Sequence, residues 1–177
     1  PMVATTHIAL RLRAEERGIK TKIVHSSSIQ TAAVGLTGLQ SYKFGRSATI
    51  PLHDIKSVHP YRVLKENKEA GLHTLLLLDY RAEEKEYLTV NEGIRVLLRT
   101  EEDLGEGVFT PETLAIGIAR AGAEATVRGD EALRLLEEDF GPPPHVLVVP
   151  GKLHFMEAKA LKILAKVPDH VLRKLEG

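Results

Sequence analysis

The sequence predicts an α/β fold with a mixed sheet, and three observations carry this prediction. Short apolar runs such as HTLLLLDY (73–80) and PPPHVLVVPG (142–151) have the length and character of buried strands. Amphipathic segments lie between these runs, and such alternation is typical of helices that cover both faces of a sheet. The expected strands that begin at Leu114 and at 125 are joined by too few residues for a parallel crossover, so we expect a mixed strand direction.

The first third of the chain is predicted to contain a helix, a strand, a compact helical segment and a second strand. An amphipathic run over about 4–17 ends at Gly18, and glycine commonly terminates helices. The β-branched and apolar run TKIVH (21–25) predicts a strand. The small residues of 29–39 predict a short, tightly packed helix or turn, and RSATIPL (46–52) predicts the second strand.

The remaining two thirds alternate helices and strands more regularly. A helix over 60–71 precedes the buried strand at 73–80. Thr89 and Glu92 are three residues apart, which is the capping-box pattern at the start of a helix that runs to about 100. The elements expected after it are a turn and then a strand within 110–122, a strand at 125–128, a helix at 130–141, a buried strand within 142–151, a helix at 153–166 and a short polar tail.

Composition and charge fit a globular protein with an aliphatic core. Hydrophobic residues make up 43% of the chain and charged residues 27%, whereas aromatic residues make up only 5%. The 24 basic and 24 acidic residues balance, so we expect no nucleic-acid partner. The absence of Cys excludes disulfides, thiolate zinc sites and thiol nucleophiles. The longest apolar run, 75–78, is far shorter than the roughly 20 residues of a membrane span, so we expect a cytoplasmic protein.

Several common site motifs do not occur in the sequence. These are the Gly-rich phosphate-binding patterns, the G-x-S-x-G nucleophile elbow and the H-E-x-x-H zinc motif. The segment HDIKSVH (53–59) places His53, Asp54 and His59 close together along the chain. A metal site needs convergent ligands at helical or hairpin spacing, so we interpret this segment as a solvated loop and predict no metal.

Four segments at the ends of expected strands carry the candidate site residues. They are HSSSI (25–29), LLLLDYRAEE (75–84), IARAG (118–122) and VVPGKLH (148–154). In open α/β sheets, ligands bind near the carboxyl ends of the strands. Each segment has a structural alternative, because serines also cap solvated turns and small residues also serve sheet packing.

Long phrases of the sequence together resemble one family. The phrases are PMVATTH (1–7), HSSSI (25–29), AVGLTGLQSYKFGRSAT (33–49), PYRVLKENKEAGLHTLLLLD (60–79), VFTPETLAIGIARAG (108–122) and EDFGPPPHVLVVPGKLHFMEA (138–158). They resemble the diphthine synthase family, which belongs to the tetrapyrrole-methylase superfamily of S-adenosylmethionine-dependent methyltransferases. The resemblance runs from Pro1 to about Lys166, almost the whole chain.

This resemblance implies a tetrapyrrole-methylase-like architecture of two α/β domains. We expect residues 1–42 to be the C-terminal part of the N-terminal methylase domain, whose beginning is missing from this sequence. Residues 43–177 are then expected to form the complete C-terminal methylase domain. The resemblance also implies a homodimer, and a cysteine-free, charge-rich composition suits an archaeal source.

In this family the methyl donor S-adenosylmethionine lies in the cleft between the two domains, and S-adenosylhomocysteine is the product. Carried over residue by residue, the resemblance implies donor contacts from Val3, Ser28, Ile29, Leu78, Ala121 and His145. Ile29, Leu78 and Ala121 would supply apolar walls and backbone groups, and Ser28 would offer a hydroxyl. Because of their placement on strand-end loops, we predict that Arg120, Lys152 and His154 orient the substrate, with plain surface residues as the alternative.

The implied reaction is methylation of the amino group on a modified histidine of translation elongation factor 2, a step of diphthamide biosynthesis. A sulfonium already has a good leaving group, so the transfer needs alignment and desolvation more than an acid–base pair. We therefore name no catalytic residue. Two alternatives stay open: a related methyltransferase acting on a corrinoid precursor or ribosomal RNA, and an inactive dimerisation or docking fragment.

Overall fold

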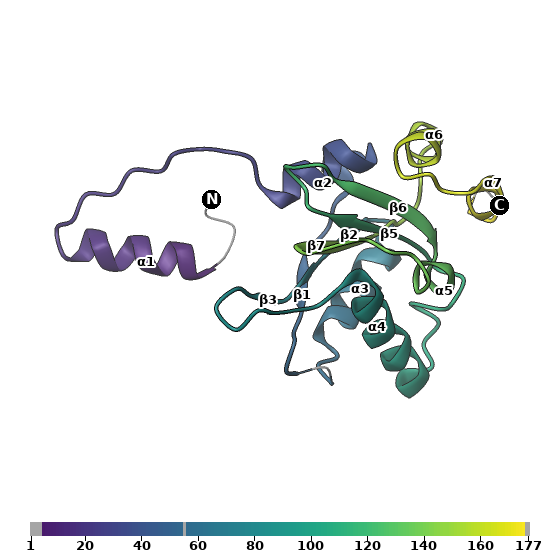
Figure 1. Ribbon diagram of the computed structural model, residues 1–177, viewed down its shortest axis with the longest axis horizontal. Helices are drawn as coiled ribbons and strands as arrows, with labels where there is room; N and C mark the ends of the chain where they lie inside the picture. The colour runs from purple at the N-terminus through teal and green to yellow at the C-terminus, as the bar shows by residue number, and fades with distance from the viewer. Residues whose placement is uncertain (1–4, 55, 176–177) are drawn as a thin grey trace.

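The structure, a computed structural model, describes residues 5–54 and 56–175 of the 177. Its centre is a five-stranded sheet in the order β1-β2-β7-β5-β6 (Figure 1). The strands are β1 (Ala48–Ile50), β2 (Thr74–Leu78), β5 (Leu114–Ala119), β6 (Thr126–Glu131) and β7 (His145–Val149). β1 pairs with β2 in parallel and all other neighbours in this sheet are antiparallel, so the predicted mixed sheet is confirmed.

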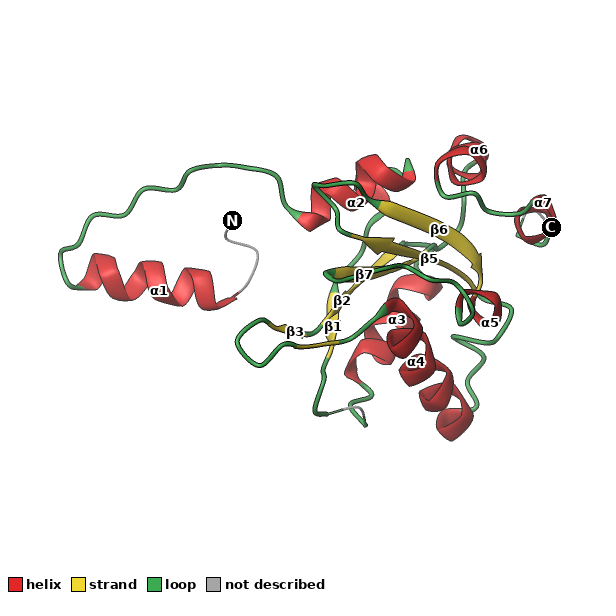
Figure 2. Ribbon diagram, viewed as in Figure 1, coloured by secondary structure: helices red, strands yellow, loops and turns green. Residues whose placement is uncertain are grey.

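Helices cover both faces of the sheet, as the alternating pattern predicts (Figure 2). One face packs against α3 (His59–Glu69), α4 (Val90–Leu104) and α5 (Ala132–Leu135), and the other against α2 (Ile29–Thr37), α6 (Phe155–Leu164) and α7 (Asp169–Arg173). Strand β2 shows why the two cores are separate. Leu76 and Leu78 belong to the first core, whereas Leu75 and Leu77 belong to the second, because successive side chains of a strand point to opposite faces.

The start of α4 confirms the predicted capping box. The Thr89 hydroxyl accepts the Glu92 N–H at 3.2 Å, and the Glu92 carboxylate accepts the Thr89 N–H at 2.7 Å. These two bonds satisfy N–H groups that have no partner inside the helix. Gly105 ends α4 in the left-handed conformation, with φ of 64°.

The N-terminal helix α1 (Thr5–Glu16) lies apart from the sheet (Figure 1). Its Leu10 is 71% exposed, and the predicted strand at 21–25 is wrong. That segment forms no strand and Val24 is 73% exposed, because no other described part of the chain offers it a backbone to pair with. The expected domain boundary after residue 42 stays a prediction.

The predicted helix at 130–141 is also wrong over most of its length. Strand β6 extends to Glu131, and helix α5 covers only 132–135. The Asn91 amide donates to the carbonyls of Leu135, Leu136 and Glu138, which takes these acceptors away from a continuing helix. After Leu135 the segment therefore forms a loop that wraps around the start of α4.

Three short features lie almost entirely in segments for which we predict no regular structure, since only Tyr80 falls within the strand predicted at 73–80. A hairpin of β3 (Tyr80–Arg81) and β4 (Glu86–Tyr87) follows β2, a 3₁₀ turn η1 covers Ser41–Lys43, and α7 lies in the polar tail. Within the described ranges, no helix combines the length and apolar character needed to cross a membrane.

Candidate functional site

A pocket of about 420 Å³ lies at one end of the sheet, on the α2 side. Because β7 runs antiparallel to both β2 and β5, its first residues meet the last residues of these strands at this end, with Leu77 opposite Val146 and Ala119 opposite His145. The residues that line the pocket and were predicted from the sequence are Ser28, Ile29, Leu78, Ala121 and His145. The remaining predicted donor residue, Val3, lies outside the described residues.

Ser28 brings the start of α2 to the pocket. It is the N-cap of α2, with extended backbone at φ −132° and ψ 162°. Its N–H donates to the Thr31 hydroxyl at 3.3 Å, and its carbonyl accepts that hydroxyl at 3.0 Å. The first-turn N–H groups of a helix lack intrahelical partners and carry positive potential, so this wall suits a polar or anionic group of a ligand.

The apolar wall comes mainly from residues that sequence reasoning missed. Leu77, Ile118 and Val146 line the pocket and belong to the core on the α2 side. Leu78 belongs to the opposite core, where its methyl group packs so closely on Gly93 that a Cβ there would lie 2.7 Å away. Leu78 therefore meets the pocket with its backbone. The two-residue period of β2 was the signal that could have found Leu77.

His145 is buried, with 5% of its surface exposed, and both ring nitrogens have partners inside the protein. Nδ1 accepts the Val90 N–H at 3.3 Å, so Nε2 carries the proton and points at the carbonyls of Gly141 and Pro142, 3.1 and 3.2 Å away. Burial lowers the pKa of His145, and the accepting Nδ1 also requires a neutral ring. The ring caps α4 and fixes the 141–145 loop. Since both ring nitrogens are occupied, only the backbone of His145 is left to contact a ligand in the pocket.

The guanidinium of Arg120 is engaged in the fold and does not line the pocket. It donates to the carbonyls of Phe140 and Pro142 at 2.8 and 3.0 Å, and to the Thr126 hydroxyl at 2.7 Å. The residue itself has φ of 54°, which turns the chain so that Ala121 and Gly122 line the pocket. Arg120 thus shapes the pocket wall through the backbone, and substrate orientation by its side chain stays a prediction.

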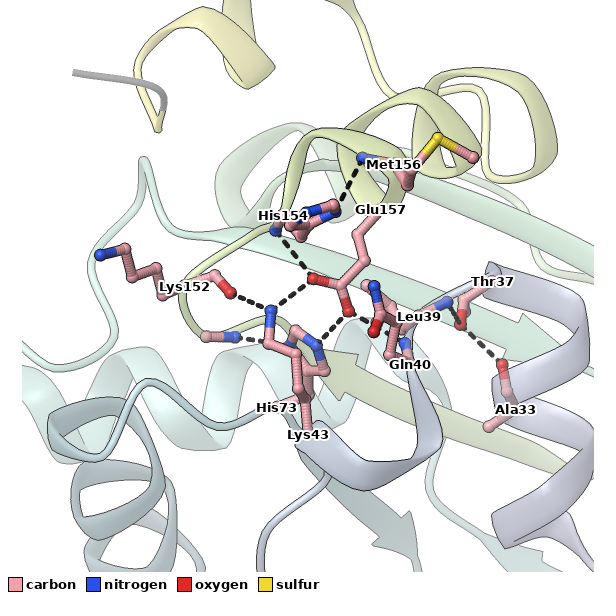
Figure 3. Close-up of polar contacts among 11 residues, drawn as sticks. Ala33, Thr37, Leu39, Gln40, Lys43, His73, Lys152, His154, Met156 and Glu157 are labelled. Carbon is pink, nitrogen blue, oxygen red and sulfur yellow. Dashed lines mark hydrogen bonds and ion pairs between the residues drawn. The ribbon is translucent and has the colours of Figure 1, made fainter.

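The structure corrects the expected position of Lys152 and His154. Since β7 is antiparallel to β2 and β5, its carboxyl end lies at the opposite end of the sheet from the pocket, with Val149 opposite Thr74. Figure 3 shows both residues there. The Lys152 carbonyl accepts Lys43 Nζ, and the His154 ring caps α6 by accepting the Met156 N–H at 3.3 Å. Neither residue lines the pocket, and their predicted role in orienting the substrate stays a prediction.

The opposite end instead holds a buried ionic network around Glu157, which sequence reasoning missed (Figure 3). The fully buried carboxylate accepts the N–H groups of Gln40 at 2.9 Å and His154 at 2.8 Å, His73 Nε2 at 2.8 Å, and Lys43 Nζ. Burial alone would raise the pKa of Glu157, but these hydrogen bonds outweigh it and lower the pKa to about 2. The pattern His154-x-x-Glu157 at a helix start was a capping signal that could have found this residue.

His73 completes this network as a neutral ring. It is fully buried, and its Nδ1 accepts the Gly151 N–H at 3.0 Å, so Nε2 donates to Glu157. Burial lowers the pKa of His73, in agreement with this tautomer. The network joins the segment after α2 to the start of β2 and to α6, and so holds α2 in place over the sheet.

The chain is similar in sequence and in structure to diphthine synthases. No protein-family model matches the chain. A diphthine synthase from Methanothermobacter thermautotrophicus is 49% identical over 99% of this chain and 67% of that protein, and one from Methanosarcina barkeri is 50% identical over 99% and 68%. A crystal structure of diphthine synthase superposes with a TM-score of 0.86 at 43% identity, over 98% of this chain and 65% of that one. The chain thus spans about two thirds of the length of these relatives.

Proposed function

The chain belongs to the diphthine synthase family of S-adenosylmethionine-dependent methyltransferases, and we propose that the pocket at the carboxyl ends of β2 and β5 is its methyl-donor site. The donor contacts would come from Ser28, Ile29, Leu78, Ala121 and His145. Val3 stays a predicted sixth contact.

The observation that supports this proposal is the convergence of these five residues in one pocket of about 420 Å³. Small-molecule sites commonly have volumes of about 300–1,000 Å³ with apolar walls and a few placed polar groups. Leu77, Ile118 and Val146 give an apolar wall that would contact an adenine ring. The start of α2 at Ser28 gives N–H groups and a hydroxyl for the ribose or the amino-acid end.

For the chemistry, the bound donor would supply an activated methyl group on a sulfonium. The chain's own residues then have two tasks, which are to hold the donor and to keep water away from the transfer path. Leu77, Ile118 and Val146 exclude water from one side of the pocket. The protonation of the His145 ring is fixed by Val90 and the carbonyls of 141–142, so the ring holds the 141–145 loop in place without taking part in proton transfer.

The substrate we propose is elongation factor 2 carrying the modified histidine of diphthamide biosynthesis, as the family name implies. We further propose that the full-length protein is a cytoplasmic homodimer of archaeal source, with residues 1–42 completing the first of two methylase domains. Analytical ultracentrifugation of the purified protein tests this proposal. A homodimer would sediment with twice the mass of one chain.

A methyl-transfer assay tests the proposed function. Elongation factor 2 that carries the modified histidine is incubated with a methyl-labelled donor and with this chain, or with the chain extended at its N-terminus to the length of its relatives. Label on the modified factor but not on the unmodified factor supports the proposal. The proposal fails if the extended chain binds the donor and transfers no label to the modified factor.

A further inference from the structure

A cluster of three potential metal ligands, none of which lines the pocket, joins the β3–β4 hairpin to the loop that follows β1. His53 comes from this loop, and Glu84 and Glu86 come from the hairpin. One ligand atom from each lies within 4.8 Å of the others, and all three residues are exposed. The segment 53–59 alone does not indicate this cluster, because its two glutamates are about thirty positions further along the chain.

Asp79, at the end of β2, ties the two elements that carry the ligands to each other through its side chain and its backbone. The Asp79 carboxylate accepts the Leu52 N–H at 3.2 Å, next to His53. The Asp79 carbonyl accepts the Leu88 N–H at 3.0 Å, which closes the base of the hairpin. A ligand set held on two tethered elements loses less conformational entropy when it binds an ion than one on free side chains.

The spacing of the ligand atoms suits a small divalent ion. Bonds of about 2.0–2.2 Å at tetrahedral angles put neighbouring ligand atoms about 3.4 Å apart. His53 Nε2 and Glu86 Oε2 are 3.4 Å apart. Glu84 needs only a side-chain movement to join them, and its present partner is Arg81, whose Nη1 is 3.1 Å from Oε2. A divalent cation would neutralise the charges of both carboxylates, whereas Arg81 neutralises only the charge of Glu84.

We infer that His53, Glu84 and Glu86 form a binding site for a divalent transition-metal ion of the zinc type. One imidazole and two carboxylates leave at least one position for water, and the imidazole favours zinc-like ions over magnesium or calcium. Bound there, the ion clamps the hairpin to the loop after β1. Since the hairpin directly follows the end of β2, the clamp fixes one border of the pocket region.

Titration of the chain with zinc chloride in a calorimeter, with magnesium chloride as a comparison ion, tests this inference. We expect saturable zinc binding that His53→Ala, Glu84→Gln or Glu86→Gln weakens about tenfold or more, as the loss of a ligand or its support does. His59→Ala and Glu83→Gln are the matched controls, because they remove the exposed histidine at the start of α3, just after the loop, and an exposed carboxylate of the same hairpin. All five positions are exposed, so the variants keep the fold.

Arg81→Gln gives a sharper result, because it should tighten zinc binding by freeing Glu84. The inference is overturned if wild-type protein binds no zinc, if His53→Ala leaves the affinity unchanged, or if the control variants weaken binding as much as the ligand variants. It is also overturned if magnesium binds as tightly as zinc. None of these measurements depends on methyl transfer, so their failure leaves the proposed donor site untouched.

Discussion

Replacement of Glu157 by Gln should destabilise the protein strongly, because this carboxylate is the acceptor at the centre of a buried network. Each of its oxygens accepts two donors: Oε1 accepts from Gln40 and His73, and Oε2 from Lys43 and His154. A Gln side chain has one oxygen and one NH₂ group. In either orientation its NH₂ faces two donors, and the ammonium of Lys43 loses its counter-charge.

Two independent arguments give the size of this effect. Removing one partner of a buried ion pair costs about 3–5 kcal/mol. A Glu157 pKa of about 2 instead of 4.5 corresponds to about 3 kcal/mol of stability at neutral pH. We therefore expect Glu157→Gln to lower the free energy of unfolding by about 3–4 kcal/mol.

The same shift predicts a pH dependence with a definite sign. The folded-state pKa of Glu157 is lowered, so its contribution is present above pH 4.5 and is lost as the pH falls towards 2. Wild-type protein should lose this stability in that window, and Glu157→Gln should lack this part of the loss. Glu101, whose pKa is also about 2, is present in both proteins, so the difference between them isolates Glu157.

Urea unfolding of both proteins at pH 7 and at pH 3 measures both effects. The matched control is Glu66→Gln, which breaks an exposed ion pair with Arg46 and should change the free energy of unfolding by less than about 1 kcal/mol. A loss under 1 kcal/mol for Glu157→Gln at pH 7, or an equal pH dependence in both proteins, would refute the reasoning.

Three further predictions concern buried contacts elsewhere in the fold. Arg120→Ala should lower the free energy of unfolding by about 2 kcal/mol, measured by urea unfolding, because three acceptors lose a charged donor; full stability together with full turnover would remove the residue from the account. Because the pKa values of His145 and His73 are lowered in the folded protein, their contribution to stability is complete above about pH 6.5 and is lost as the pH falls. His145→Gln should therefore flatten the dependence of the unfolding free energy on pH between about pH 7 and 5. An unchanged slope would contradict this. Gly117→Val should lower the thermal midpoint sharply, with a cost of about 3 kcal/mol, because a Cβ at 117 would lie 2.3 Å from a ring carbon of Phe140; an unchanged midpoint would show that the ring moves freely.

The sequence predicts those parts of the fold that local chemistry determines. The capping box at Thr89 and the continuous apolar run of β2 are local signals, and both elements form where expected. The segment at 21–25 has strand chemistry, yet it forms no strand because pairing depends on a partner that local sequence does not specify. The helix expected at 130–141 failed for a similar reason, since three of its carbonyls bind Asn91, which lies 44 or more positions earlier in the chain.

The positions of the candidate site residues were likewise predicted well where the family resemblance named them and poorly where their position depends on long-range strand pairing. The family resemblance named five residues that the fold brings into one pocket, although they come from four separate segments. Lys152 and His154 were expected to join a shared edge of strand ends, which requires parallel strands. The antiparallel direction of β7 sends them to the other end of the sheet, and no short-range pattern shows this direction.

The most direct test of the donor site is a calorimetric titration with S-adenosylhomocysteine, made on this chain, on an N-terminally extended chain, and on both with Ala121→Phe. Ala121 lines the pocket and is only partly buried, so a ring there fills the pocket without entering the core. We predict saturable binding near one site per chain for the extended protein, and its loss in the Ala121→Phe variant with an unchanged thermal midpoint. Binding by the extended protein that Ala121→Phe leaves unchanged would contradict the assignment of this pocket.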